Sequence, residues 1–556
     1  MNATRRNVLK LAGGGAVGAL FTPAPWRLIT DAALWSENWP GIPRPARGEI
    51  TSKATNCSLC TAGCPVRARC VAGQPVAMIG AQCPFGITGH HLPYHPARVR
   101  QGPVQQAAEA VARGRRVAVL DLRPGRTASW TYRRAMKAMK GTYIAPPQPP
   151  AAVDLAAAKI VLSAGVPVLE DWGTPRNVLA ARGHFRLIYA GAVETRTAAL
   201  ADEWIRVQPG SEQALVEGIA GSISAGEAAA RTGIPAERIA SLAAELRDGG
   251  PSLVLDAEFS PEALSLSTGT LAVRAEAPVP ATWAREAAPV TALADVANGS
   301  IDVLLIDESA PGEYLPWNTI QPKLVRNDAA VIAFAWSRRG YGRWANYVLP
   351  APVYPEALDD IPPAIDSPAP VFRLSVPLMT PPEGTINPAK FAGDLAGINA
   401  AAALRGRAKA IDASDEFWKS LNEGATWIGK PKAWQAGSLS QKSMGSQSPA
   451  AETDLPLTVV LTERRGGAAP VSPLLSKLYQ ESELRLKPNR AALNPDDARA
   501  AGLAEGERAS LQTAIGRCDI AVAFDASLPR GVVEAAARPG ILDVCAPGAR
   551  AKVVRL

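Results

Sequence analysis

The sequence predicts a multidomain α/β protein whose C-terminal part is built mainly from β-strands. Its 556 residues correspond to roughly three or four domains at about 150 residues each. Short apolar runs with the length of a buried strand recur at 117–120, 159–162, 186–189, 252–255, 302–306 and 330–334. Helical patterns such as 212–222 and 236–246 lie between them, and this alternation indicates a parallel sheet. From residue 457 onward strand patterns dominate, at 458–461, 508–511 and 519–524.

The composition excludes several other classes of protein. Hydrophobic residues make up 47% and charged residues 20%, which is ordinary globular usage and excludes a disordered chain, a coiled coil or a collagen-like repeat. The formal net charge is +8, but Arg5, Arg6, Lys10 and Arg27 supply four of these charges within the first 30 residues. The rest of the chain therefore does not indicate a nucleic-acid partner.

The N-terminus has the layout of an export signal. A charged stretch at 4–10 precedes eleven weakly apolar residues, which are too few to span about 30 Å of hydrocarbon as a helix. The pair Arg5-Arg6, with Leu9 and Lys10, resembles a twin-arginine signal. We therefore expect residues 1–30 to direct export to the periplasm or the outer face of the cytoplasmic membrane. A basic tail without structure is the alternative, and whether the segment is cleaved stays open.

The cysteines are the most informative residues, since five of the seven lie between Cys57 and Cys83. Cys57, Cys60 and Cys64 fall within eight residues, and Cys83 follows in the sequence Cys-Pro-Phe-Gly. Buried thiolates converge only around a group that compensates their charge. A [4Fe–4S] cluster takes four such ligands, typically three close together and one distant. We therefore predict that Cys57, Cys60, Cys64 and Cys83 bind the iron of one [4Fe–4S] cluster.

The cysteine spacing leaves three alternatives to an iron–sulfur cluster open. Zinc usually takes two paired knuckles, but only one Cys-x2-Cys is present. A structural disulfide between Cys57 and Cys60 would join residues that are awkwardly close. A redox pair of the thioredoxin type lacks its strand-to-helix setting and leaves Cys64 unexplained.

The remaining cysteines and the histidines are interpreted as packing or surface residues. Cys70 lies in the alternating, strand-like stretch 66–71, while Cys518 and Cys545 are either free or paired. Three of the four histidines follow Cys83 at His90, His91 and His95. Pro93 and Pro96 prevent a helix that would bring His91 and His95 onto one face, so a metal site is not expected there.

These residues, in this order, resemble the N-terminal cluster domain of the molybdopterin oxidoreductase (dimethyl sulfoxide reductase) family. The similarity continues through the chain in the stretches 71–80, 94–98, 160–172, 201–215, 345–350 followed by Glu356, and 493–498 followed by Gly502 and Gly506. The resemblance implies an N-terminal iron–sulfur domain, Rossmann-like parallel-sheet domains and a C-terminal six-stranded β-barrel-like domain, the molybdopterin-dinucleotide-binding-like domain of the family.

The resemblance and the composition together suggest domain boundaries. We expect the [4Fe–4S] domain at 48–103, a discontinuous α/β domain at 104–158 and 250–429, a Rossmann-like α/β domain at 159–249, and the barrel-like domain at 457–556. Residues 430–456, rich in Gly, Ser, Gln and Pro, are interpreted as a linker.

Two departures from the family argue against molybdenum, and the compact chain argues against a cavity for two molecules of molybdopterin guanine dinucleotide, although whether a pterin is bound without the metal stays open. Molybdenum-containing members commonly carry a basic residue, usually Lys, two positions after the fourth cysteine, where this chain has Phe85. The stretch 141–154, which corresponds to the source of the metal ligand, is short and holds no Cys or Ser. Asp154 is better explained as a helix N-cap.

The stretches 169–172, 202–204 and 209–212 resemble the polysulfide reductase-like branch of the family. That branch includes the large subunits of alternative complex III and of the periplasmic quinone reductase complex, which are understood to work without molybdenum. The resemblance implies an exported electron-transfer subunit of a membrane-associated, quinone-linked respiratory complex. It also implies a ferredoxin-like iron–sulfur subunit, a quinone-binding integral membrane subunit and cytochrome c as partners. Because the chain has no Cys-x-x-Cys-His, a c-type haem would belong to a partner.

Two alternatives to this function remain. One is a catalytic molybdopterin oxidoreductase that acts on a small inorganic substrate such as polysulfide. The other is a scaffold subunit without a redox role.

Overall fold

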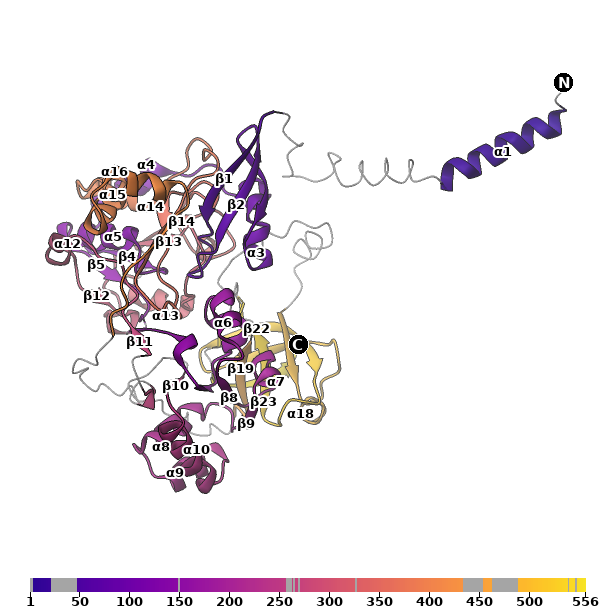
Figure 1. Ribbon diagram of the computed structural model, residues 1–556, viewed down its shortest axis with the longest axis vertical. Coiled ribbons are helices and arrows are strands. Elements are labelled where there is room, and N and C mark those ends of the chain that lie inside the picture. Colours follow the sequence, from indigo (N-terminus) through magenta and orange to yellow (C-terminus); the bar gives the residue numbers. More distant parts are fainter. Residues whose placement is uncertain are drawn as a thin grey trace.

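The computed structural model describes residues 4–21, 48–148, 151–256, 263, 266–268, 271–325, 328–433, 454–462, 489–538, 540–545 and 548–556. Of the predicted export signal, residues 5–21 form helix α1 (Arg5–Phe21), which stands apart from the body of the molecule (Figure 1). Among the helices described, none combines the length and the apolar character needed to cross a bilayer.

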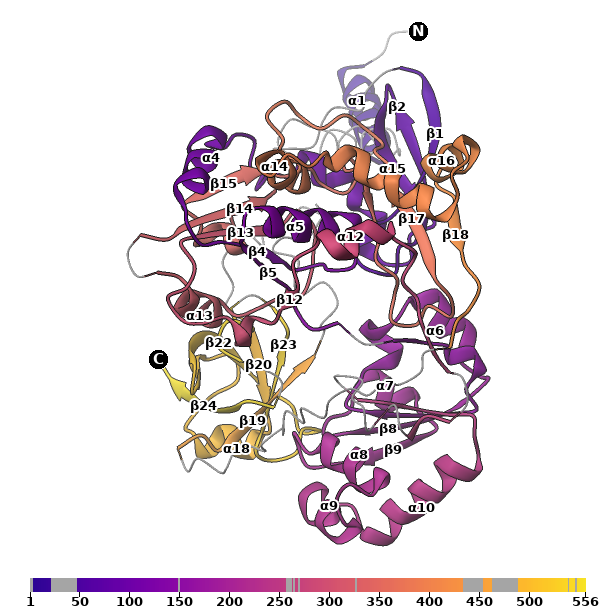
Figure 2. The ribbon, with the colours of Figure 1, turned by 90° about the vertical axis from the view of Figure 1, so that its left-hand side faces the viewer.

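The largest sheet has six strands, all parallel, in the order β12-β5-β4-β13-β14-β15. Its strands are β4 (Val117–Asp121), β5 (Thr142–Ile144), β12 (Val290–Thr291), β13 (Val303–Glu308), β14 (Ala330–Ala335) and β15 (Tyr347–Pro350). Helix α5 (Thr127–Ala138) packs on β4 and β5, and α12 (Ala281–Glu286), α14 (Pro388–Leu395) and α15 (Ala400–Ile411) pack on α5 (Figure 2). Helix α4 (Val104–Arg113) packs against β15. The two central strands are buried throughout, as their continuous apolar sequences predict.

A second parallel sheet has the order β10-β7-β8-β9. Its strands are β7 (Ile160–Ala164), β8 (Arg186–Gly191), β9 (Glu203–Arg206) and β10 (Ser252–Leu255). Helices α8 (Glu212–Ala220), α9 (Ala225–Thr232) and α10 (Ala236–Asp248) bury an apolar face against it, while α6 (Pro175–Ala181) and α7 (Arg196–Leu200) lie nearer β7 and β8. Strand β10 lies beyond residue 249, where the sequence places the end of this domain, and still belongs to this sheet. Helix α10 brings the chain back so that β10 pairs with β7 at the edge of the sheet.

All of the apolar runs that the sequence predicts to be strands are strands, namely β4, β7, β8, β10, β13 and β14. The two helical patterns correspond to α8 and α10. The prediction of parallel sheets is therefore confirmed. It succeeds because a strand buried on both faces has to be apolar at every position.

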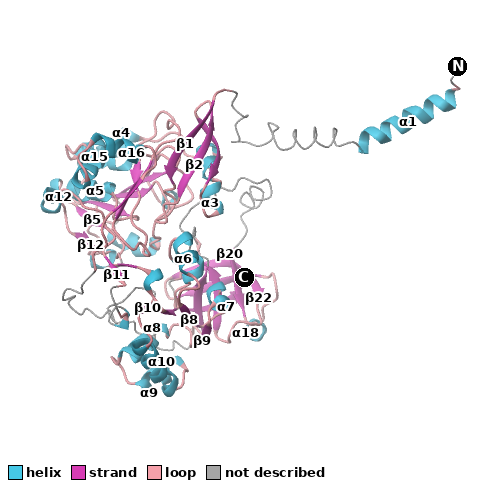
Figure 3. Cartoon of the chain, viewed as in Figure 1, coloured by secondary structure: helices cyan, strands magenta, loops and turns pink. Residues whose placement is uncertain are grey.

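The C-terminal part is a closed barrel with the strand order β19-β23-β20-β22-β21-β24. Figure 3 shows β20 and β22 among the magenta strands beside the C-terminus. Its strands are β19 (Leu457–Thr462), β20 (Asn489–Leu493), β21 (Arg508–Thr513), β22 (Gly516–Phe524), β23 (Val532–Ala536) and β24 (Arg550–Arg555), with helix α18 (Pro495–Ala500) after β20. The predicted six-stranded barrel is confirmed. Most of the predicted linker, residues 434–453, lies outside the described residues. Residues 430–433 run beside strand β11 (Ala272–Val273), where Arg274 N donates to Lys432 O at 2.9 Å.

The cysteine-rich segment forms a small antiparallel sheet of β1 (Ile50–Asn56), β2 (Pro65–Val71) and β3 (Gln74–Ile79), followed by the short helices α3 (Pro84–Ile87) and η1 (Gly89–Tyr94). Side chains of β1 join this sheet to strand β17 (Val371–Ser375) and the residue after it. Thr55 Oγ1 donates to Val376 O at 2.9 Å, and the buried Asn56 Nδ2 donates to Leu374 O at 2.9 Å.

Candidate metal centre

Four cysteines, Cys57, Cys60, Cys64 and Cys83, come together beneath the small sheet, and we call them the four-cysteine site. The first three lie on the loop between β1 and β2, which is closed by a hydrogen bond from Cys57 N to Cys64 O at 2.9 Å. Cys83 is the N-cap of α3, and its sulfur accepts a hydrogen bond from Gly86 N at 3.4 Å. Cys57 and Cys64 are buried, while Cys60 and Cys83 are half-buried.

Gly86 shows that Cys57 and Cys83 line the same space. A Cβ atom added to Gly86 would lie 3.5 Å from Cys57 Sγ and 3.8 Å from Cys83 Sγ. The same Cβ atom would lie only 2.8 Å from the Cβ atom of Ala81, so the close packing at this position requires glycine. This close approach lets its N–H group reach a sulfur atom.

The thiols affect one another electrostatically. Burial raises the pKa of Cys57 far above its ordinary value, and the nearby Cys60, Cys64 and Cys83 raise it further. Burial also raises the pKa of Cys64, with Cys60 and Cys83 adding to the shift and Arg373 opposing it. A bound positive charge would therefore favour the thiolate forms of Cys57 and Cys64.

Two arginines from other parts of the chain hold the cysteine loop. Arg373, on β17, donates from Nη2 to Thr61 O at 2.8 Å, and burial lowers the pKa of its guanidinium. Its Nε atom is buried and has no hydrogen-bond partner among the described residues. Arg123, in the loop after β4, donates from Nη1 to Ser58 O at 2.6 Å.

Arg123 belongs to a buried network of acids and arginines at the carboxyl ends of β4 and β13. Arg126 pairs with Asp121 at 3.3 Å, Asp307 at 2.7 Å and Asp359 at 2.7 Å. Arg123 Nη2 lies 3.7 Å from the Asp359 carboxylate. The network connects the central sheet to the carbonyl of Ser58, inside the cysteine loop.

Sequence reasoning missed these arginines. The one available signal was that Asp121 and Asp307 stand at the carboxyl ends of adjacent buried strands, an edge where parallel sheets gather functional groups. Arg123 is 65 positions from Ser58 in the sequence, and Arg373 is 312 positions from Thr61. A local sequence pattern cannot reveal contacts between residues so far apart.

Cys70 and the histidines that the sequence assigns to packing or to the surface lie around the four-cysteine site. Cys70 is fully buried in β2, and burial raises its pKa. The ring of His95 meets Trp336 edge-on at 5.5 Å, and His90 Nδ1 lies 3.0 Å from Ile87 O, with burial lowering the pKa of His90 to about 4. Pro93 is accommodated inside the 3₁₀ helix η1.

Cys518 and Cys545, in the barrel, form no disulfide. Across the described ranges, no set of three or more His, Cys, Asp or Glu side chains, the four thiols of the site included, stands in the geometry that would hold a single metal ion.

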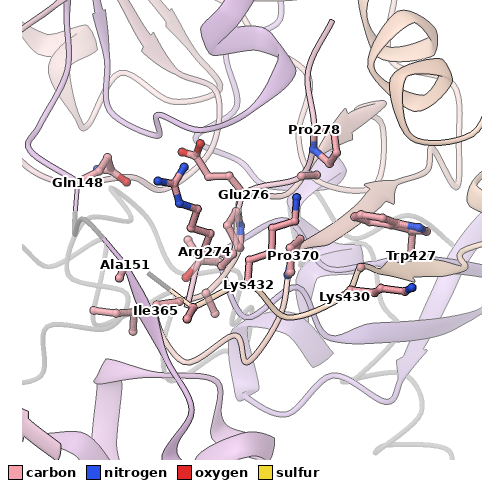
Figure 4. A pocket seen from close by; sticks show the side chains of 18 of the residues that line it. Gln148, Ala151, Arg274, Glu276, Pro278, Ile365, Pro370, Trp427, Lys430 and Lys432 are labelled. Carbon is pink, nitrogen blue, oxygen red and sulfur yellow. The ribbon is translucent and has the colours of Figure 1, made fainter. Parts of the chain in front are cut away.

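A cavity of about 1300 Å³ opens beside the cysteine loop, with Thr61 in its wall. Figure 4 shows Arg274, Glu276 and Lys432 projecting into the same space. Glu313 also faces the cavity, and burial raises its pKa to about 7. The described lining residues include no Cys, Ser, His or Asp. The cavity is larger than the usual small-molecule pocket of about 300–1000 Å³.

The structure also shows where Phe85 and Asp154 lie, the two residues at which the sequence departs from the molybdenum-containing members of the family. Phe85 is half-buried on α3. Asp154 Oδ1 accepts a hydrogen bond from Ala156 N at 3.0 Å and caps the 3₁₀ helix η2 (Leu155–Ala157), as predicted. Neither residue is in the described wall of the cavity.

No known family profile matches this chain, but nearly all of it is similar to known proteins. It is 26% identical to the menaquinone reductase molybdopterin-binding-like subunit of Nitratidesulfovibrio vulgaris (strain Hildenborough), over 94% of this chain and 91% of the relative. Its fold matches acetylene hydratase from Pelobacter acetylenicus, with a TM-score of 0.67 and 13% identity. That match covers 91% of this chain and 100% of the other.

Proposed function

We propose that the chain is a member of the molybdopterin oxidoreductase family and an electron-transfer subunit of a membrane-associated, quinone-linked respiratory complex, which its similarity to a menaquinone reductase subunit and its fold support. In this proposal it carries one [4Fe–4S] cluster on Cys57, Cys60, Cys64 and Cys83. The observation that carries the proposal is the convergence of these four thiols from two separate segments in a buried site.

The residues present fit a four-iron cluster, because such a cluster takes one thiolate at each of its four irons and the site brings four thiols together. The N–H of Gly86 on Cys83 Sγ is the kind of hydrogen bond that stabilises cluster thiolates.

The bound cluster would supply one-electron redox chemistry, and the protein would control its environment. Burial of Cys57 and Cys64 excludes water. Arg123 and Arg373 hold the loop carbonyls of Ser58 and Thr61, and Arg373 also places positive charge near the Cys64 sulfur. Positive charge favours the more negative, reduced state, so these arginines raise the reduction potential.

The proposed partners are a ferredoxin-like iron–sulfur subunit, a quinone-binding integral membrane subunit and cytochrome c. The name of the menaquinone reductase relative supports assembly with a quinone-reactive complex. The Arg5-Arg6 pair at the start of α1 supports export by the twin-arginine route to the periplasm or the outer face of the membrane.

A second candidate is a molybdopterin oxidoreductase acting on a small inorganic substrate such as polysulfide. The cavity favours it, because Arg274, Lys430 and Lys432 in its wall suit an anionic dinucleotide. The described wall offers no thiol, hydroxyl or imidazole from Cys, Ser or His to a metal. We therefore rank this function second.

Metal analysis of the purified full-length protein tests the proposal. We expect about four irons per chain and no molybdenum. Iron together with stoichiometric molybdenum would favour the second candidate. A folded protein with neither metal would refute the electron-transfer role and leave a scaffold.

A further inference from the structure

The side chain of Arg373 reaches from β17 into the middle of the cysteine loop, where it lies against Gly63. A Cβ atom added to Gly63 would lie 2.2 Å from Nε, 2.3 Å from Cζ and 2.5 Å from Nη2 of Arg373. Gly63 also has a φ of +53°, in the region that favours glycine. The guanidinium therefore fills the space that a side chain between Cys60 and Cys64 would occupy.

The strand that carries Arg373 is fixed to the same loop. Asn56, the residue before Cys57, donates from Nδ2 to the carbonyl oxygen of Leu374 at 2.9 Å. At its other end, Arg373 donates from Nη2 to Thr61 O at 2.8 Å. The side chain is held at both ends, so that its guanidinium is already ordered beside the thiols before any ligand binds.

The positive charge of Arg373 acts mainly on cysteines of the site. Burial lowers the pKa of its guanidinium, and four groups oppose this effect, which are, in decreasing order, Cys64, Cys60, Asp366 and Cys57. Three of the four belong to the four-cysteine site. Arg373 in turn lowers the pKa of Cys64, against the effect of burial.

One donor of this guanidinium lacks an acceptor. The Nε atom of Arg373 is buried, and no group among the described residues accepts a hydrogen bond from it. Buried donors are nearly always paired, and leaving a charged one unpaired is costly. Sulfur is a weak acceptor as a thiol and a much better one when it carries negative charge. An iron–sulfur cluster on these cysteines would bring such charged sulfur atoms to the site.

We propose that Arg373 is a cofactor-binding residue, whose Nε–H donates a hydrogen bond to a sulfur atom of the cluster in the four-cysteine site. The inference deepens the proposed function and rests on it. Hydrogen bonds to cluster sulfurs and nearby positive charge favour the reduced state. Arg373 keeps its proton when the cluster takes up one electron, so its part is to bind the cluster and to set its potential.

Pulsed electron paramagnetic resonance of the reduced, full-length protein tests the hydrogen bond. Arginine labelled with ¹⁵N in the guanidinium places a nuclear spin at Nε, which couples to the electron spin of the cluster through an N–H···S contact. We expect this coupling in the wild type and its loss in Arg373→Gln. It should persist in Arg69→Gln, the matched control, because Arg69 is an exposed arginine of β2.

The reduction potential is a second readout, and anchoring of the loop alone would not shift it. At a fixed potential, Arg373→Gln should lower the ratio of reduced to oxidised cluster about tenfold relative to Arg69→Gln, which is about 59 mV for one electron. Arg373→Lys keeps the charge but has no Nε, so it should recover only part of the ratio.

A second variant alters neither a charge nor a cysteine. Gly63→Ala puts a Cβ atom where the guanidinium lies, so it should weaken the ¹⁵N coupling and lower the ratio of reduced to oxidised cluster. Gly73→Ala is its control, since Gly73 has a φ of +76° and an added Cβ atom would meet nothing within 4 Å. The control should leave both readouts unchanged.

Iron content and reducibility of the cluster are measured first for every variant. A wild-type chain without a reducible cluster would refute both the proposed function and this inference. A reducible wild-type cluster without coupling to arginine nitrogen, or equal potentials in Arg373→Gln and Arg69→Gln, would refute the role of Arg373 alone. If Arg373→Gln loses its iron, the wild-type coupling and Gly63→Ala decide between these outcomes.

Discussion

Arg98 and Glu356, 258 residues apart in the sequence, form a buried ion pair with two parallel hydrogen bonds, Nη1 to Oε1 at 2.6 Å and Nη2 to Oε2 at 2.5 Å. Their side chains are 1% and 0% exposed. Arg98 follows the histidine-containing helix η1, and Glu356 follows strand β15 of the large sheet. The pair therefore fastens the segment beside the four-cysteine site to the α/β body.

Breaking this pair should destabilise the protein strongly. Arg98→Ala leaves a buried carboxylate without its partner, so the free energy of unfolding should fall by about 3–5 kcal/mol in denaturant titrations. Arg116→Ala is the control, since Arg116 pairs with Asp302 at the surface and is 53% exposed. That change should lower the free energy of unfolding far less, because water and salt screen an exposed ion pair. Equal losses in the two variants would contradict the structural role of the pair.

Serine substitutions should separate ligand cysteines from packing cysteines. Cys60→Ser removes a thiolate from the four-cysteine site and should lose most of the iron and of the visible absorbance of the cluster. Cys70→Ser is the matched control, since Cys70 lies on the buried side of β2 and should keep its iron. Loss of iron in the Cys70 variant alone would show that the ligand set has been assigned wrongly.

Arg123 should raise the reduction potential of the proposed [4Fe–4S] cluster. Arg123→Gln removes a positive charge that donates to Ser58 O, and it also leaves Asp359 less compensated. Both effects disfavour the reduced cluster, so the midpoint potential should fall by about 30–60 mV, where 59 mV is tenfold for one electron. Arg123→Lys should recover part of the shift. An unchanged potential in Arg123→Gln with full iron content would remove Arg123 from this role.

Glu308 should make stability depend on pH. Burial raises the pKa of this carboxyl to about 7, and it accepts hydrogen bonds from Tyr341 N at 3.0 Å and Gly342 N at 3.3 Å. The folded state then binds a proton more tightly than the unfolded state. The protonated Glu308 therefore makes its full contribution to the free energy of unfolding below about pH 4.3. This contribution, on the order of 3 kcal/mol, is lost as the pH rises to about 7.

The test compares denaturant midpoints of the wild type and Glu308→Gln between pH 4.5 and 7. The wild type should lose stability across this window relative to the variant, because glutamine does not titrate. Parallel profiles would show that Glu308 has no raised pKa.

The sequence was sufficient to predict the sheets and the barrel, but only part of the site. Strands β4 and β13 are apolar at nearly every position, so burial on both faces can be read directly from their residues. The cysteine spacing likewise singles out four residues that the fold brings together. Arg123 and Arg373 could not be chosen among 59 Lys and Arg residues, because their contacts depend on how distant segments pack. The pairing of β10 with β7 was missed for the same reason. The sequence shows that residues 252–255 form a strand, but it does not show which sheet that strand joins.

The most direct test of the electron-transfer role is a redox titration of the purified full-length protein followed by electron paramagnetic resonance. We expect a signal from the reduced cluster that appears with one-electron dependence and integrates to about one spin per chain. It should persist in Cys70→Ser and vanish in Cys60→Ser. An iron-loaded protein that stays silent at every accessible potential would contradict the proposal that this chain carries electrons.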